Sequence, residues 1–387
     1  MGLALVACSQ ADDPVGPVNP SYSITFNTAD SAEQVTRAGN TEGLQTIGHT
    51  EIKVYGYKTL NGTIQNVMPG YTLRYVDGTA NSSTSNSTGW EYVGLTDATS
   101  ATVKDYMNQA QEIKYWDGNS TDYRFFGVLS NLNTNLKYDG QAITSSTVVA
   151  NDKAFTMEFP NLAYMTRNVD SNGNYIYYKG NTTTTVDEKD IPMYGSLWHG
   201  DPLDNYDKPV TLSFSKPYSL VRLVFIRPDG SSVTQLGEST TNSATFMPTD
   251  DSLISNEGTV SVTWSMTGAE ETTTATASKA TLPSMTFDPI ELTTADTRYQ
   301  VWPEYLMVPT TSDDANVDYE CTVNVKKEDG SGFDKRTARI PKQFTHWKAG
   351  YEYTYVFKIT FNNSLEFSHV VETYTKWQAG YADTTKW

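Results

Sequence analysis

Apolar residues alternate with polar ones along many short stretches of the chain. In the stretch 319–326 the apolar residues occupy every second position, namely Tyr319, Cys321, Val323 and Val325. A period of two places such residues on one face of a β-strand. This stretch is therefore predicted to be a strand, with Cys321 as a small core residue and not as a nucleophile. The stretch 51–58 alternates in the same way around Ile52 and Val54.

Turn signals separate these stretches. Asn-Gly and Asp-Gly pairs tolerate the positive φ angles of a type I′ hairpin turn. We expect six of these pairs to be turns: Asn61-Gly62, Asp77-Gly78, Asp139-Gly140, Asn172-Gly173, Asp229-Gly230 and Asp329-Gly330. Strong core strands are predicted at 123–129, 155–159, 210–214, 220–226 and 351–359. Many short strands joined by turns, with almost no long helix, indicate an all-β fold of β-sandwiches.

The length of the chain predicts more than one domain. Domains usually run to about 100–200 residues, and this chain has 387. The segment 195–209 is rich in Gly, Pro, Asp and Asn and is the best candidate for a linker. We therefore expect an N-terminal β-sandwich over 41–200 and a C-terminal β-sandwich over 201–387.

The formal net charge of −17 disfavours nucleic acid as a partner, because the phosphates would be repelled. An acidic surface rich in Thr, Asn, Ser and Tyr suits an extracellular protein. Beyond residue 8 no apolar run approaches the roughly 20 residues needed to span a bilayer. The chain has two cysteines, Cys8 and Cys321, so no disulfide framework is expected.

The N-terminal residues carry a signal of their own. Leu5-Val6-Ala7-Cys8 resembles the lipobox of bacterial lipoproteins, in which the cysteine thiol receives a diacylglyceryl group. Cys8 is therefore the predicted lipidation site. Residues 2–7 are shorter than the roughly 7–15 apolar residues of an export signal, so residues 1–8 are expected to be the remnant of a longer one. A polar tether rich in Pro, Gly and Asn follows, within the predicted segment 9–40.

Several short motifs, taken in order, resemble the fimbrillins, the type V pilins and related surface lipoproteins of Bacteroidales. Besides the lipobox they are Tyr123-Arg124-Phe125-Phe126, Asp190-Ile191-Pro192-Met193-Tyr194, Val210-Thr211-Leu212-Ser213-Phe214, Leu306-Met307-Val308-Pro309 and Trp347-Lys348-Ala349-Gly350-Tyr351. The resemblance covers nearly the whole chain, and the order of the motifs carries more weight than any one of them.

This resemblance implies two tandem transthyretin-like β-sandwiches and export as an outer-membrane lipoprotein. It also implies that an arginine-specific protease at the cell surface removes an N-terminal strand, which a strand from the next subunit then replaces. Arg37 and Ala38 match the family's cleavage position. The removable strand would include Tyr22, Ile24 and Phe26, which alternate with polar residues. Strand addition of this kind builds filaments, because a head-to-tail contact does not close on itself.

The replacing strand has a candidate near the C-terminus. There Leu365, Phe367, His369 and Val371 alternate with Glu366, Ser368 and Val370. The alternative is that this stretch is simply the last strand of the second domain. The partners implied are other fimbrial subunits, the arginine-specific protease, the lipid anchor, and a host glycan or protein receptor. Neither the role of the subunit within a fimbria nor its adhesion target follows from the sequence.

We find no catalytic constellation, and expect no enzyme activity, cofactor or metal. Gly-x-Ser-x-Gly and His-Glu-x-x-His motifs are absent, and the histidines (His49, His199, His346 and His369) lack metal-ligand spacing. Two rival functions remain. One is a carbohydrate-binding surface lipoprotein, suggested by 25 Tyr and 8 Trp. The other is a secreted hydrolase, which would need two carboxylates converging in a cleft.

Overall fold

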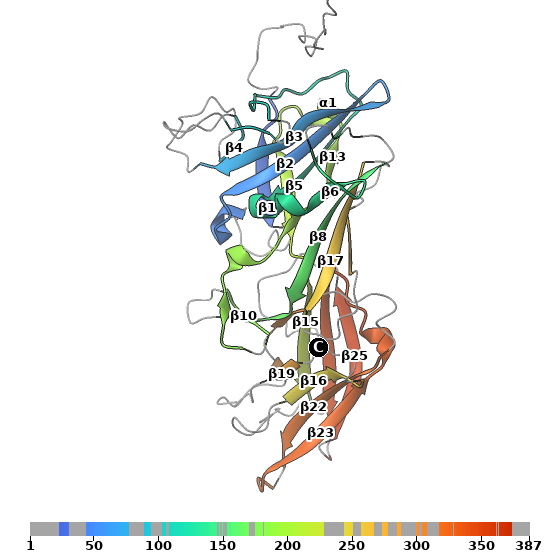
Figure 1. The fold of residues 1–387 in the computed structure, drawn as a ribbon. Coiled ribbons are helices and arrows are strands. Elements are labelled where there is room, and N and C mark those ends of the chain that lie inside the picture. Colours follow the sequence, from blue (N-terminus) through green and yellow to red (C-terminus); the bar gives the residue numbers. More distant parts are fainter. Residues whose placement is uncertain are drawn as a thin grey trace, which may run out of the picture.

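The computed structural model describes the protein over most of its length and is predominantly β, as predicted. The residues that it describes are 23–30, 44–76, 89–93, 103–105, 108–144, 147, 149, 153–169, 175–180, 182–227, 244–250, 257–266, 273–277, 285–287, 299–301, 304–307, 317–327, 329–360, 362 and 364–373. Figure 1 shows an elongated molecule built of four sheets, with the first at one end and the third and fourth together at the other.

The first sheet, which we call the ring sheet, lies at the end of the molecule where β2 and β3 are seen in Figure 1. Its strands run in the order β12-β14-β1-β4-β3-β2-β5-β13, and a further pairing of β12 with β5 closes the first seven into a ring. Their bounds are β1 Phe26–Asp30, β2 Glu51–Leu60, β3 Thr63–Tyr75, β4 Trp90–Glu91, β5 Asp122–Leu129, β12 Tyr194–Gly195, β13 Trp198–Gly200 and β14 Val210–Ser215. A closed ring leaves few backbone groups unpaired, because each member strand has a neighbour on both sides.

A second sheet packs against the outer face of β2 and β5. Its order is β18-β17-β8-β6-β7, with β6 Leu136–Tyr138, β7 Gln141–Ala142, β8 Ala154–Ala163, β17 Glu257–Ser265 and β18 Thr273–Ala277. The long strands β8 and β17 run from the ring sheet toward the other end of the molecule (Figure 1). β5 is therefore buried on both faces: Phe125 belongs to the core inside the ring, while Phe126 belongs to the core beneath the second sheet.

The third and fourth sheets form the opposite end of the molecule and enclose a separate core. The third has the order β11-β10-β9-β21-β15-β24-β25, with β20 also paired to β15, and the fourth has the order β19-β16-β22-β23. The third contains β9 Met165–Val169, β10 Tyr175–Lys179, β11 Thr185–Val186, β15 Ser219–Ile226, β20 Tyr299–Val301, β21 Glu304–Met307, β24 Glu352–Ile359 and β25 Leu365–Thr373. The fourth contains β16 Ala244–Pro248, β19 Met285–Phe287, β22 Tyr319–Lys326 and β23 Phe333–Ile340.

Within the described residues, helical structure is limited to short segments of three to six residues. They are α1 (Pro202–Asn205) and the 3₁₀ turns η2 (Leu44–Ile47), η3 (Ser130–Asn135), η4 (Glu188–Asp190) and η7 (Lys342–Phe344). In the part of the chain that is described, none of these helices has the length and apolar character required to cross a membrane.

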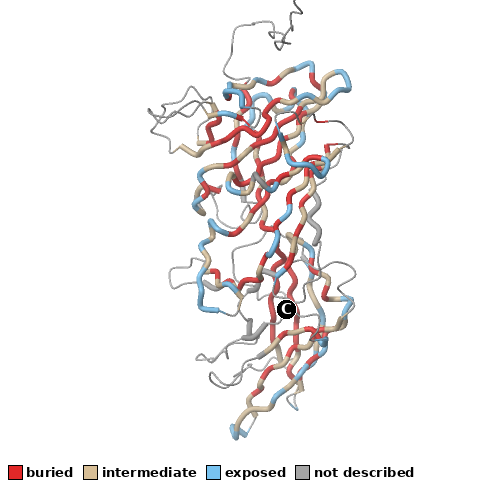
Figure 2. The backbone as a smooth tube through the Cα atoms, viewed as in Figure 1, coloured by how far each residue is buried: buried red, intermediate tan, exposed pale blue. Residues whose placement is uncertain are grey.

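The burial of the strands follows the predicted alternation. In β22 the buried positions are Tyr319, Cys321, Val323 and Val325, each separated by a partly exposed residue. Asn61 and Gly62 have φ angles of 51° and 74°, and Asp139 and Gly140 have 49° and 75°, which are the angles that these two hairpin turns were predicted to need. Figure 2 shows buried backbone running along the paired strands from one end of the molecule to the other.

Strand pairing crosses residue 200 in both directions. β14 pairs with β1, and β17 pairs with β8, so strands after residue 200 complete the sheets of the N-terminal half. Conversely β9 pairs with β21 in the third sheet. The segment 195–209, expected to be a linker, contains β13, which pairs with β5, and α1. The strands of residues 41–200 and those of residues 201–387 therefore pair with each other and do not form two separate sets. The sequence did not predict this sharing, because local composition carries no information on which distant strands pair.

Candidate functional site

The N-terminal strand β1 is a member of the ring, lying between β14 and β4. It runs parallel to β14 over five residue pairs, from Phe26 opposite Val210 to Asp30 opposite Phe214. On its other side it pairs with β4 at a single position, Phe26 opposite Trp90. Just before the strand, the amide of Ile24 donates to the carbonyl of Lys114 at 2.8 Å. These contacts make β1 the only described element that connects β14 to β4.

The side chains of this strand alternate between core and surface. Ile24 and Phe26 are completely buried inside the ring. The Phe26 ring stands edge-on to Tyr92 and Phe125, with centroid separations of 5.9 and 5.5 Å, the arrangement that aromatic quadrupoles favour. Asn27, between the buried Phe26 and Thr28, is exposed. Burying an Ile and a Phe side chain contributes roughly 1.5–3 kcal/mol each, so β1 is held by its side chains as well as by its backbone.

Loss of β1 would create an acceptor for another strand. The edge of β14 would lose its parallel partner over five residues, and the space vacated by Ile24 and Phe26 would be lined by the apolar core of the ring. Unpaired N–H and C=O groups along a strand edge, together with an apolar slot, are what an added strand needs in order to bind. The site is thus a groove with a strand already in it.

Four of the predicted residues lie outside the described part of the chain. They are Cys8, Tyr22, Arg37 and Ala38, so lipidation and cleavage stay predictions. Arg37 does lie between β1 and η2 in chain order. A cut after Arg37 would therefore separate β1 from every element that follows it.

The candidate donor strand is β25, at one edge of the third sheet. It pairs antiparallel with β24 of the same chain. Leu365 is buried, and Phe367 packs partly buried on the core of this end of the molecule. Between Phe367 and His369 the register shifts, which leaves Ser368 as an extra residue, and a bulge of this kind re-aims the side chains beyond it. His369 is consequently exposed, and Val370, not the predicted His369, packs on the core.

The other residues that could carry chemistry do not converge. Within the described residues no group of three or more His, Cys, Asp or Glu side chains is placed to hold a metal ion. His199 in β13 contacts Asp122 in β5. Cys321 is free and completely buried, and burial raises the pKa of its thiol far above the ordinary value. Its predicted role as a core residue is confirmed.

A buried charged cluster between the two halves of the molecule was not predicted. Lys216, which follows β14, places its Nζ 2.8 Å from Oε1 of Glu188 in η4. The hydroxyl of Tyr177 in β10 donates to the same oxygen at 2.9 Å. Burial by itself would raise the pKa of Glu188, but Lys216, together with Tyr177 and Arg167, outweighs it and holds the pKa below the ordinary value. The three residues belong to three separate elements of the chain, so no local pattern predicted the cluster.

Comparison with known proteins gives a distant likeness. No family model matches the chain, and no curated protein matches it. The structure is similar to the crystal structure of a proposed cell adhesion protein from Bacteroides uniformis, with a TM-score of 0.36 and 12% identity over 92% of this chain and 98% of that one. A proposed cell adhesion protein from Bacteroides ovatus gives a TM-score of 0.34 and 11% identity over 90% of this chain and 97% of that one. A proposed polysaccharide-binding protein from Bacteroides thetaiotaomicron gives 0.31 and 9%, over 92% and 96%. With TM-scores this low, the likeness assigns neither a family nor a function to this chain.

Proposed function

We propose that this protein is a pilin-like structural subunit of surface fimbriae and that it assembles by strand exchange. In this proposal it is exported as an outer-membrane lipoprotein through Cys8, and an arginine-specific surface protease cuts between Arg37 and Ala38. The released segment carries β1 away, and a strand of a neighbouring subunit takes its place. The assembled fimbria serves adhesion. The two ends of the molecule would be two transthyretin-like β-sandwiches in tandem.

The observation that carries the proposal is the position of β1. A dispensable N-terminal arm would lie on the surface of the molecule, whereas Ile24 and Phe26 are completely buried in the ring. The strand is short, five residues, and it belongs to a segment that ends before the arginine-containing stretch 31–43. β1 is short, its side chains occupy a slot in the ring, and a single cut after Arg37 would free it from the rest of the chain. Such a strand suits replacement by a strand of another subunit.

The protease experiment tests this directly. We expect that digestion of the full chain with an arginine-specific protease, followed by intact-mass measurement, shows a cut after Arg37. Gel filtration with light scattering should then show the monomer converting into a ladder of oligomers. The matched control is Arg37→Lys, which keeps the positive charge but not the protease site, and which should stay monomeric under the same treatment.

Two outcomes would contradict the proposal. One is a chain that is cut after Arg37, has lost residues 1–37 so that the ring slot is open, and still remains monomeric. The other is equal polymerisation of the Arg37→Lys protein, which would show that assembly does not require the cut. Negative-stain microscopy of the oligomers separates filaments from amorphous aggregates.

A further inference from the structure

The inward face of the β1 segment is not wholly apolar. Ile24, Phe26 and Thr28 occupy alternate positions and are all buried, at 0%, 1% and 6% exposure. Residues at every second position share one face of a strand, so the threonine follows the two apolar side chains on the face that fills the slot. A buried hydroxyl calls for a hydrogen-bond partner.

The partner of Thr28 lies on the far side of the arginine-containing stretch 31–43. The backbone amide of Leu44 donates to Oγ1 of Thr28 at 3.2 Å, and this bond is buried. Leu44 is the first residue of η2, and the first N–H groups of a helical turn have no acceptor within the turn. β1 therefore supplies the cap for a turn that begins beyond that stretch.

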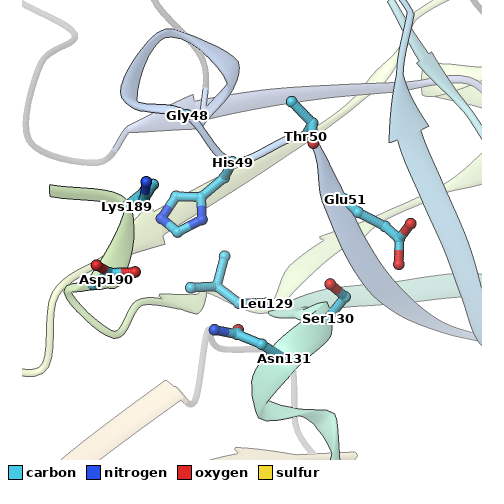
Figure 3. A pocket seen from close by; sticks show the side chains of 9 residues that line it. All are labelled: Gly48, His49, Thr50, Glu51, Leu129, Ser130, Asn131, Lys189 and Asp190. Atoms are coloured by element: carbon cyan, nitrogen blue, oxygen red, sulfur yellow. The ribbon is translucent and has the colours of Figure 1, made fainter. Parts of the chain in front are cut away.

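The capped turn also fixes the residues that follow it. The carbonyl of Leu44 accepts a hydrogen bond from the amide of His49 at 3.0 Å. The His49 side chain lies beside Leu129 and Asp190 (Figure 3), in a small cavity bordered by the turn before β2, by the start of η3 and by η4. Leu44 itself is completely buried in the core of the ring. The Thr28 hydroxyl thus stabilises a turn that is built into the wall of the ring.

Loss of β1 would remove this acceptor and leave the donor behind. A cut after Arg37 puts Thr28 on the released segment and Leu44 on the body of the protein. No other acceptor for the Leu44 amide is present among the described residues. A buried donor without an acceptor is unfavourable, so an incoming strand has to supply an acceptor as well as apolar side chains.

We propose that the ring slot selects its incoming strand by a Ser or Thr hydroxyl at the position of Thr28. This inference rests on the proposed strand exchange and adds the chemistry of the partner strand: two apolar side chains and then a hydroxyl, on alternate residues. An apolar pocket discriminates only weakly between similar side chains, whereas a site built around a hydrogen bond rejects a partner that lacks the group. The hydroxyl is therefore the selective element of the slot.

This requirement bears on β25, the candidate donor strand. If Leu365 and Phe367 take the two apolar positions of β1, His369 stands at the position of Thr28. An imidazole ring is larger than the hydroxyl side chain that this buried position holds. The proposal therefore disfavours β25 in this register as the incoming strand.

The first test uses the uncut full chain and three variants. Thr28→Val removes the hydroxyl and keeps the shape, and Thr28→Ser keeps the hydroxyl. The matched control, Thr25→Val, makes the same chemical change at a partly exposed position on the other face of the segment. Hydrogen exchange of the Leu44 amide, followed by NMR, should be at least about fivefold faster in Thr28→Val, the factor that corresponds to about 1 kcal/mol. Thr28→Ser and Thr25→Val should exchange at close to the wild-type rate.

The second test measures selection of the strand itself. Wild-type protein is digested with the arginine-specific protease and offered equimolar synthetic peptides of residues 21–30, unchanged, with Thr28→Val or with Thr25→Val. The peptides that the protein retains after gel filtration are identified by mass. We expect the Thr28→Val peptide to be retained at least about fivefold less than the other two.

The outcomes separate this inference from the assembly proposal. A cut protein that stays monomeric but discriminates against the Thr28→Val peptide contradicts assembly and supports the inference. A protein that polymerises but retains the three peptides equally overturns the inference and leaves strand exchange in place. Equal exchange of the Leu44 amide in the Thr28→Val and Thr25→Val proteins also overturns the inference, and this measurement requires neither the cut nor polymerisation.

Discussion

Replacing Phe26 by alanine measures how firmly β1 is held in its slot. Phe26 is 1% exposed, with two aromatic rings edge-on to it, and truncating a buried Phe to Ala typically costs about 3–5 kcal/mol. After a cut at Arg37, β1 is held only by non-covalent contacts. The lost free energy therefore weakens the binding of the cut segment to the ring. At about 1.4 kcal/mol per factor of ten, we expect the segment to bind about two to three and a half powers of ten more weakly.

Release of the cut segment is the quantity to measure. Wild-type and Phe26→Ala proteins are digested to completion, passed rapidly over a gel-filtration column, and sampled over time by mass spectrometry for residues 1–37. Because affinity differences within one interface appear mainly in the dissociation rate, the variant should release its segment much faster. Oligomers should then form earlier, since an empty slot is what an incoming strand requires.

The matched control lies one position along the same strand. Asn27 is exposed, so Asn27→Ala leaves the slot filled and should release its segment at the wild-type rate. Equal release from the Phe26→Ala and Asn27→Ala proteins would refute the reasoning, because it would mean that the buried side chains of β1 do not hold the strand in place.

Three further predictions concern the packing of the molecule. Gly195→Ala should lower the free energy of unfolding by about 1–3 kcal/mol, because the new Cβ would lie 2.7 Å from a backbone carbonyl oxygen of β5. In the control Gly118→Ala the new Cβ would make only an ordinary van der Waals contact, so the free energy of unfolding should change by no more than about 0.5 kcal/mol. Equal denaturation curves for the two variants would contradict the tight closure of the ring. In a variant without the other cysteine, Cys321 should resist a thiol reagent in the native protein and react after unfolding, since burial raises the pKa of the thiol; rapid native labelling would show that it is accessible. Because the pKa of Glu188 is held below its ordinary value of about 4.3, its pair with Lys216 stabilises the fold above that pH, and the stability is lost as the pH falls through the lower folded pKa. Glu188→Gln should flatten this acid dependence and destabilise the protein at pH 7 by about 1–3 kcal/mol, and unchanged urea curves across pH 3–7 would count against the pair.

Local patterns in the sequence determined the strands and many of their faces. The alternation from Tyr319 to Val325 predicted which side chains of β22 face the core. Likewise, the alternation of Ile24 and Phe26 predicted a strand, and both residues are buried. The Asn61-Gly62 pair predicted a turn with two positive φ angles, as found. Each of these features depends on residues that are neighbours in the chain, so a period of two or a turn signal suffices to reveal it.

The tertiary structure alone decided which strands pair. β8 pairs with β17 and β1 pairs with β14, across separations that no local pattern encodes. Many strands of similar composition could pair with each other, and the choice among them depends on how whole faces pack. The predicted boundary near residue 200 and the linker over 195–209 were inferred from composition, which cannot detect such pairings.

The same reason explains the features that sequence reasoning missed. The bulge at Ser368 turns His369 outward, because β24 sets the register of its neighbour. Lys216, Glu188 and Tyr177 meet only after three separate segments have packed. The cavity at His49 likewise takes its walls from three segments. Periodicity along the chain determined that this protein is built of strands, whereas long-range packing decided which surfaces, slots and cavities those strands create.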